Sequence, residues 1–104
     1  MSTTLHTVNR SPFEHRALAS CLARVRPGSA VLLIEDGVLG ALAGSPHADR
    51  LAAAAAGGVE VFALGPDLDA RGIEAGRRAG CIEVVDYAGF VALACRFAKT
   101  AAWT

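Results

Sequence analysis

The sequence predicts an α/β fold, a three-layer sandwich in which about five mainly parallel strands form a sheet with helices on both faces. Short apolar or β-branched runs alternate with helical segments along the chain, and this alternation gives parallel strands joined by helices. Residues 30–34 (AVLLI) are apolar without alternation, as expected of a central strand covered on both faces. The 104 residues contain no repeat or linker, so we take residues 1–104 as a single domain.

The first strand and the first helix are expected near the start of the chain. Residues 3–8 are mostly β-branched or apolar and predict a strand. Ser11 and Glu14 have the spacing of a capping box, and Pro12 suits the first helical position, so we expect a helix from Ser11 to about Val25. Its apolar residues recur at helical spacing: Phe13, Ala17, Leu18, Cys21, Leu22 and Val25.

The middle of the chain continues this alternation. After the strand at 30–34, residues 35–37 (EDG) are expected to form a turn, and 38–43 one or two turns of helix. Residues 47–56 predict an alanine-rich helix, which the glycine pair at 57–58 terminates.

The second half of the chain predicts the remaining elements. They are a strand at 59–64 broken by Gly65-Pro66, a short helix with loops at 67–80, a strand at 82–85, a helix at 87–99 and an edge strand at 101–103. Asp86 is placed to cap the last helix. The apolar stripe of that helix includes Phe90, Leu93, Ala94 and Phe97.

Composition narrows the possible functions. Ten basic and ten acidic residues cancel without a basic stripe, so direct binding to nucleic acid is not expected. The chain opens without an apolar signal segment and has no run long enough to span a bilayer, which predicts a cytoplasmic protein without a membrane anchor. The apolar fraction of 53% is high beside a charged fraction of 19%, so we expect an apolar interface and oligomerisation.

Few residues could carry chemistry. No glycine-rich phosphate motif follows a strand, and the three cysteines and three histidines lack metal-ligand spacing, so we expect no cofactor and no metal. The turn at 9–12 (NRSP) could hold an anion at a helix N-terminus, but capping alone explains Ser11 and Pro12. Glu35 and Asp36 follow a central strand, where α/β sheets place their sites, and such a carboxylate pair could serve acid/base chemistry, but Asp36-Gly37 is an ordinary turn signal and the turn is favoured.

Cys21 is the nucleophile that we retain as a candidate. Its place in the apolar stripe of the first helix predicts a buried, unreactive thiol, but a position at the edge of the stripe would bring it to an interface or to solvent. His15 and Arg24 are its expected polar neighbours. Cys81 and Cys95 are expected to be packing residues.

Sequence blocks spread over nearly the whole chain resemble the DsrH/TusB family. They keep the family's order and are specific when taken together. The blocks are 5–13 (LHTVNRSPF), 20–22 (SCL), 31–37 (VLLIEDG), 41–44 (ALAG), 64–72 (LGPDLDARG), 84–91 (VVDYAGFV) and Trp103.

This resemblance implies a flavodoxin-like (DsrE-like) fold, in agreement with the element order above. It also implies a hetero-hexamer that contains two copies each of this chain, of a DsrE-like subunit and of a DsrF-like subunit. In such complexes the main persulfide-carrying cysteine belongs to the DsrE-like subunit, and sulfur passes to a small DsrC/TusE-like carrier. We therefore expect an accessory subunit of a sulfurtransferase complex that is not catalytic alone.

The resemblance leaves two alternatives open. The family has one branch in sulfur oxidation and one, TusB-like, in 2-thiolation of the wobble uridine of tRNA. Cys21 matches a cysteine of the sulfur-oxidiser branch, which favours oxidation. The chain could serve assembly alone, or it could accept sulfur with Cys21 as a persulfide site. An unrelated receiver-like regulator is disfavoured, because the acidic cluster and phosphate-facing lysine of such domains are missing.

Overall fold

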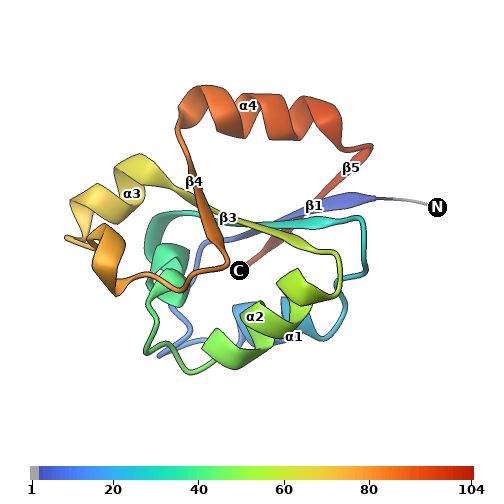
Figure 1. Cartoon of the computed structure of the whole chain (residues 1–104). Coiled ribbons are helices and arrows are strands. Elements are labelled where there is room, and N and C mark those ends of the chain that lie inside the picture. The colour runs from blue at the N-terminus through green and yellow to red at the C-terminus, as the bar shows by residue number, and fades with distance from the viewer. Residues whose placement is uncertain (1–2) are drawn as a thin grey trace.

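The computed structural model describes residues 3–104 and contains one parallel sheet of five strands with helices on both faces (Figure 1). The strand order is β4-β3-β2-β1-β5, and every neighbouring pair is parallel, so the predicted three-layer fold is confirmed. The elements in chain order are β1 (Thr4–Val8), α1 (Ala17–Leu22), β2 (Ala30–Leu33), the 3-10 helix η1 (Glu35–Ala41), α2 (Ala48–Ala56), β3 (Glu60–Leu64), α3 (Gly65–Ala70), the 3-10 turn η2 (Ala75–Arg77), β4 (Ile82–Val85), α4 (Tyr87–Arg96) and β5 (Lys99–Trp103).

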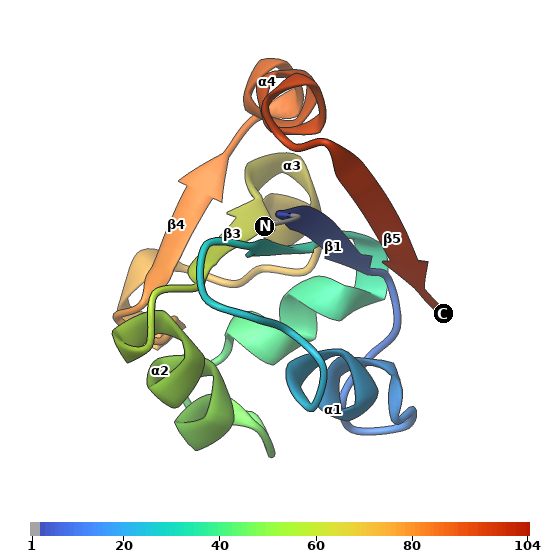
Figure 2. The same ribbon diagram turned by 90° about the vertical axis from the view of Figure 1, so that its right-hand side faces the viewer.

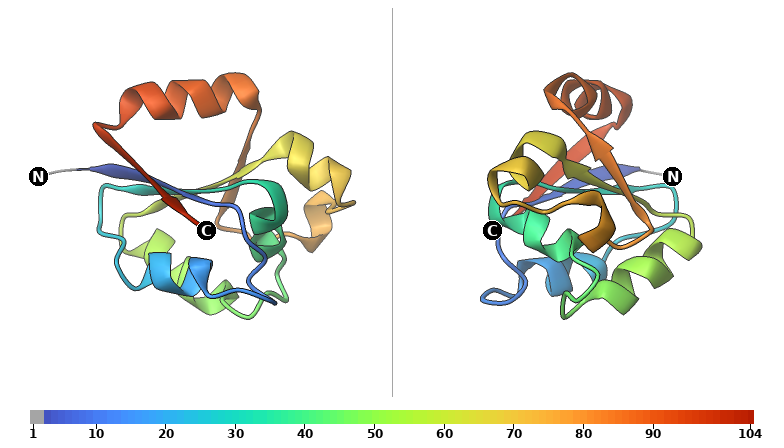
Figure 3. Two further views of the ribbon diagram at one scale, coloured as in Figure 1. Left: turned by 180° about the vertical axis from the view of Figure 1, so that it is seen from behind. Right: turned by 60° about the vertical axis from the view of Figure 1, so that its left-hand side comes forward.

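The two faces of the sheet are covered unequally. α1 and α2 lie on one face, whereas within the described residues only α4 crosses the other (Figures 1 and 3). One helix is about 10 Å wide and five strands span about 24 Å, so α4 leaves part of its face uncovered. The main core, on the α1 and α2 side, includes Val8, Leu18, Cys21, Val31, Leu33, Leu51 and Val61. The smaller core under α4 consists of Leu5, Ala30, Leu32, Phe62, Leu93 and Phe97.

The centre of the sheet forms because β2 is apolar on both faces. Every residue of β2 is buried, with Val31 and Leu33 in the main core and Ala30 and Leu32 in the smaller one. This alternation follows from the two-residue period of a strand. The unbroken apolar run in the sequence therefore predicted the central strand correctly.

The strand order reverses between β1 and β5. β2, β3 and β4 lie on one side of β1 in sequence order, and β5 lies on the other. The carboxyl ends of the two strands meet where the backbone N–H of Asn9 donates to the carbonyl of Trp103 (3.5 Å). Open α/β sheets place ligands at such reversals, so this edge is a candidate position for a site.

The first helix begins later than predicted, and the expected capping box at Ser11 is wrong. Ser11 Oγ accepts the N–H of Phe13 (3.2 Å), and its carbonyl accepts that of His15 (3.0 Å), which closes a single turn. Ser11 and Pro12 are buried, whereas Phe13 is 55% exposed. Packing of this turn therefore outweighs the local capping signal, and α1 starts only at Ala17.

Residues 35–37, expected to form a turn, and Gly65-Pro66, expected to break a strand, both begin helices. η1 begins at Glu35, which has a positive φ of 51°, and α3 begins at Gly65, with Pro66 in its first turn where a missing N–H costs little. η1 packs tightly against the end of β1. A Cβ added at Gly37 would overlap the carbonyl oxygen of Val8, so this position requires glycine.

The end of the chain folds largely as predicted. Asp86 Oδ1 accepts the N–H of Gly89 (2.8 Å), which confirms the expected cap of α4. α4 ends at Arg96 and not at Lys99, because Lys99 already pairs with Thr4 in β5. Within residues 3–104, no helix combines the length and the apolar character needed to cross a bilayer.

Candidate functional site

Cys21 lies in the main core. α1 turns its side chain toward the sheet, and the residue is 0% exposed. Burial raises the pKa of the Cys21 thiol to about 12. His15 and Arg24, which we expected beside it, are exposed, whereas Cys21 is buried. Sulfur chemistry requires an accessible thiolate, and Cys21 is neither accessible nor ionised in this structure.

The other two cysteines have different environments. Cys81 is half-buried and packs against the main core, as predicted. Cys95 is exposed on α4, so its predicted packing role is wrong. A helix that lies on one face of a sheet buries only one stripe, and on α4 that stripe contains Leu93 and continues to Phe97 directly after the helix. All three thiols are free.

The turn after β1 does not form the anion site considered from the sequence. That hypothesis needed a helix N-terminus at Ser11, and α1 instead begins at Ala17. The Ser11 hydroxyl accepts the N–H of Phe13 and holds the turn. Asn9 Oδ1 is buried and has no hydrogen-bond partner among residues 3–104. The hydrogen bonds of Ser11 are thus used to hold the turn and not to bind an anion.

Glu35 and Asp36 belong to a network that joins η1 to α3. Asp67 Oδ2 accepts the backbone N–H of Glu35 (2.7 Å). Arg71 donates to Asp36 Oδ1 from Nη2 (2.9 Å) and from Nε (3.1 Å), and its Nη1 donates to the carbonyl of Asp67 (3.2 Å). The Asp36 side chain is mostly exposed and paired with a guanidinium. This arrangement fixes two helices together and lacks the buried, unpaired carboxylate of a general acid.

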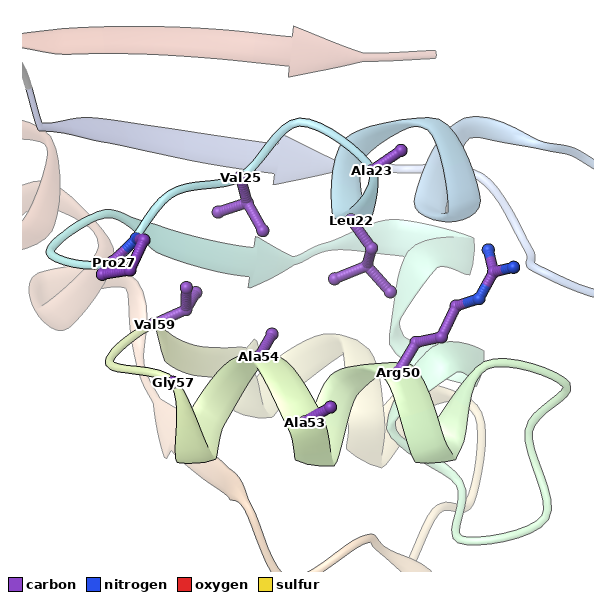
Figure 4. Close-up of a pocket in the computed structure, with 9 residues that line it drawn as sticks. All are labelled: Leu22, Ala23, Val25, Pro27, Arg50, Ala53, Ala54, Gly57 and Val59. Carbon is purple, nitrogen blue, oxygen red and sulfur yellow. The ribbon is translucent and has the colours of Figure 1, made fainter.

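A groove of about 540 Å³ lies between α1 and α2 (Figure 4). Leu22 and Val25 face Ala54 and Val59 across it, and the guanidinium of Arg50 stands at one end (Figure 4). Its lining is completed by Ala23, Pro27, Ala53 and Gly57. Apart from Arg50, these residues are apolar or glycine, so the groove is suited to hold apolar groups.

The sequence analysis did not identify this groove. Its size depends on the separation of α1 and α2, which local patterns do not determine. The signal that could have indicated it is the alanine run at 52–56, because small side chains leave space between neighbouring helices. Among residues 3–104, no group of three or more His, Cys, Asp or Glu side chains is placed to hold a metal ion.

The outward side of α4 is apolar and exposed. Tyr87 is 61% exposed and Val91 63%. We use the name outer α4 face for the exposed set Tyr87, Ala88, Val91, Ala94 and Cys95. Ala94 was predicted to lie in the buried stripe and is instead exposed. Arg96, the one charged residue of α4, pairs with Glu60 and leaves the outer α4 face uncharged.

The chain is similar to known proteins over almost its whole length. The family model described as "DsrH like protein" matches residues 10–100. "Protein TusB" of Pectobacterium parmentieri is 37% identical over 99 residues, which cover 95% of this chain and 99% of that protein. "Protein TusB" of Enterobacter sp. (strain 638) is 38% identical with the same coverage.

Two solved structures share the fold. The crystal structure of the ychN protein from E. coli matches with a TM-score of 0.86 and 17% identity, and the match covers 99% of this chain and all of that one. MTH1491 from Methanobacterium thermoautotrophicum, a protein of unknown function, matches with a TM-score of 0.70 and 17% identity, over 95% and 97% of the two chains. At such low identity these structures support the fold alone.

Proposed function

The chain belongs to the DsrH/TusB family, and from this membership we propose that it is an accessory, non-catalytic subunit of a cytoplasmic sulfur-relay complex. The proposed partners are a DsrE-like and a DsrF-like subunit, with two copies of each of the three chains, and a DsrC/TusE-like protein as the sulfur carrier. The apolar composition and the uncharged outer α4 face support assembly, because exposed apolar patches mark contact surfaces.

The chemistry of the relay explains why the burial of Cys21 matters. In one transfer step, the thiolate of the acceptor attacks the outer sulfur of a donor persulfide. A new S–S bond forms on the acceptor, the old S–S bond breaks, and the donor leaves as a thiolate. The acceptor must therefore be both exposed and ionised.

The burial of Cys21 is the observation that carries the accessory role. The side chain has no exposed surface, and its pKa is raised to about 12 by burial. A persulfide donor could reach this thiol only if α1 moved away from the sheet. We therefore place the relay cysteine in the DsrE-like partner and give this chain a role in assembly.

Mass spectrometry of each subunit after incubation of the complex with a persulfide donor tests the proposal. We expect the DsrE-like partner to gain a sulfur atom, Cys21→Ser to leave assembly and transfer unchanged, and replacement of the partner's relay cysteine to abolish transfer. Because Cys95 is exposed, any added sulfur on this chain must be localised by peptide mapping. Persulfide on Cys21 together with a stalled relay in Cys21→Ser would show that Cys21 is a sulfur acceptor.

For the pathway, we propose 2-thiolation of tRNA wobble uridine, with sulfur oxidation as the alternative. Cys21 was the reason to favour oxidation, and its burial weakens that reason. The similarity to TusB proteins favours thiolation. Deletion of the gene followed by measurement of 2-thiouridine in total tRNA separates the two. Unchanged thiouridine with impaired oxidation of reduced sulfur compounds would favour the alternative.

A further inference from the structure

The outer edge of β5 is open. Within residues 3–104, β5 pairs only with β1 and forms the end of the sheet, on the outside of the molecule (Figure 2). Natural proteins protect such edges with proline, central charges or covering segments. β5 has the sequence KTAAW, with no proline and with its single charge, Lys99, at the first position.

The backbone of β5 presents hydrogen-bonding groups at this edge. The carbonyl of Trp103 faces β1, since it accepts the N–H of Asn9. Backbone groups of successive strand residues point to opposite sides, so the N–H and C=O groups of Thr100 and Ala102 point away from β1. Both of these residues are exposed. The edge thus offers two donors and two acceptors in a row.

We propose that the β5 edge binds the β5 edge of a second copy of this chain, antiparallel, with the two-fold axis beside Ala101. In this register Thr100 lies opposite Ala102 of the second copy, and the two residues exchange backbone hydrogen bonds. Symmetry repeats this exchange on the other side of the axis. The two sheets then join into one continuous sheet.

The side chains of β5 suit this register. Lys99 lies opposite Trp103 of the second copy, on the same face, where an ammonium group and an indole ring attract each other. Small side chains at Thr100, Ala101 and Ala102 allow the strands to approach. A parallel pairing in register would instead place the two Lys99 side chains together, which is unfavourable.

The other edge of the sheet is less suited to self-pairing. β4 carries an exposed carboxylate, Glu83, near its middle, and a two-fold axis there would bring two carboxylates together. The proposal for β5 uses only the groups of that strand, so it is independent of the proposed sulfur relay. A five-residue strand pair is smaller than an ordinary stable interface, so we expect a weak, concentration-dependent dimer.

Cysteine crosslinking of the full chain tests the register. In a Cys81→Ser/Cys95→Ser background, we expect Ala101→Cys to form a disulfide-linked dimer under mild oxidation. Residues that face each other at a non-hydrogen-bonded position have Cα atoms about 4.5 Å apart, which is within disulfide range. Thr100→Cys and Ala102→Cys are the matched controls. Neither should crosslink alone, whereas a mixture of the two should give a heterodimer.

Sedimentation velocity provides a second measurement that does not depend on cysteine chemistry. Ala102→Pro removes an outward N–H without removing a bond to β1, and edge strands tolerate proline at such positions. We expect this variant to stay folded by circular dichroism and to weaken the dimer roughly tenfold or more. Equal crosslinking at 100, 101 and 102, or a wild-type chain that is monomeric up to millimolar concentration, would overturn the proposal.

Discussion

Trp103 donates a hydrogen bond from Nε1 to Nδ1 of His6 (3.0 Å), and this bond ties β5 to β1 through their side chains. The two rings lie 6.1 Å apart between centroids. His6 is 9% exposed, and burial lowers its pKa below the ordinary value of 6.5. Nδ1 can accept this bond only while it carries no proton. The attachment of the edge strand is therefore linked to the protonation of a buried histidine.

The stability of the fold should depend on pH through His6. Its pKa is lower in the folded state than in the unfolded state, so above about pH 6.5 both states are neutral and the stability is complete. As the pH falls below that value, the unfolded state binds a proton first, and the free energy of unfolding decreases until the folded pKa is passed. Urea titrations across this range measure the effect.

His6→Asn separates this contribution from that of the carboxylates, because the amide oxygen can accept from Trp103 but does not titrate. We expect a smaller loss of stability on acidification in His6→Asn than in the wild type. His15→Asn replaces an exposed histidine and is the matched control. We expect its stability to change with pH as that of the wild type does. Identical curves for all three proteins would contradict the role of His6.

Trp103→Phe should destabilise the fold by about 1–2 kcal/mol, because it keeps an aromatic ring but leaves Nδ1 of His6 without its donor. Trp103 is the only tryptophan of the chain, so unfolding must be followed by circular dichroism and not by fluorescence. In combination with His6→Leu, which removes the acceptor, the two effects should be non-additive, since each variant breaks the same bond. Additive effects would show that the bond contributes nothing.

The three cysteines should react with iodoacetamide in a fixed order. Cys95 is exposed and should be alkylated first, half-buried Cys81 more slowly, and Cys21 only when the protein unfolds. Peptide mapping after timed quenching measures the order, and denatured protein, in which all three should react at similar rates, is the control. Rapid labelling of Cys21 in the folded chain would remove the main support for the accessory role.

Gly37→Ala should destabilise the protein by about 3 kcal/mol or more, because the added Cβ overlaps the backbone of Val8 and pushes η1 from the end of β1. Gly44→Ala is the matched control. An added Cβ there has no atom within 4 Å and φ is not positive, so the change should be neutral or slightly stabilising. Chemical denaturation of both variants measures the difference.

The sequence predicted the strands better than the helix boundaries. The apolar run of β2 could be interpreted locally, because burial on both faces leaves a direct pattern in the chain. The start of α1 could not be predicted locally. The capping signal at Ser11 was strong, but burial of Ser11 and Pro12 outweighed it. Local capping is worth about 1 kcal/mol, which tertiary packing readily exceeds.

The candidate site was predictable only in part. The apolar stripe of α1 correctly indicated a buried Cys21. The exposure of Cys95 was not predicted, because it depends on which side of α4 faces the sheet in the assembled fold. The groove beside Leu22 and Val59 likewise arises from the spacing of two helices, which is a property of the assembled fold.

The position of β5 beside β1 also sets a delay during synthesis. His6 and Trp103 are 97 residues apart in the chain, and at about 5–20 residues per second a ribosome needs roughly 5 to 20 s to add the second after the first. Throughout this interval β1 has no neighbour on its outer side, even when β2 already covers the inner one. Until β5 is translated, the outer edge of β1 in the nascent chain must therefore stay free of aggregation or be bound by a chaperone.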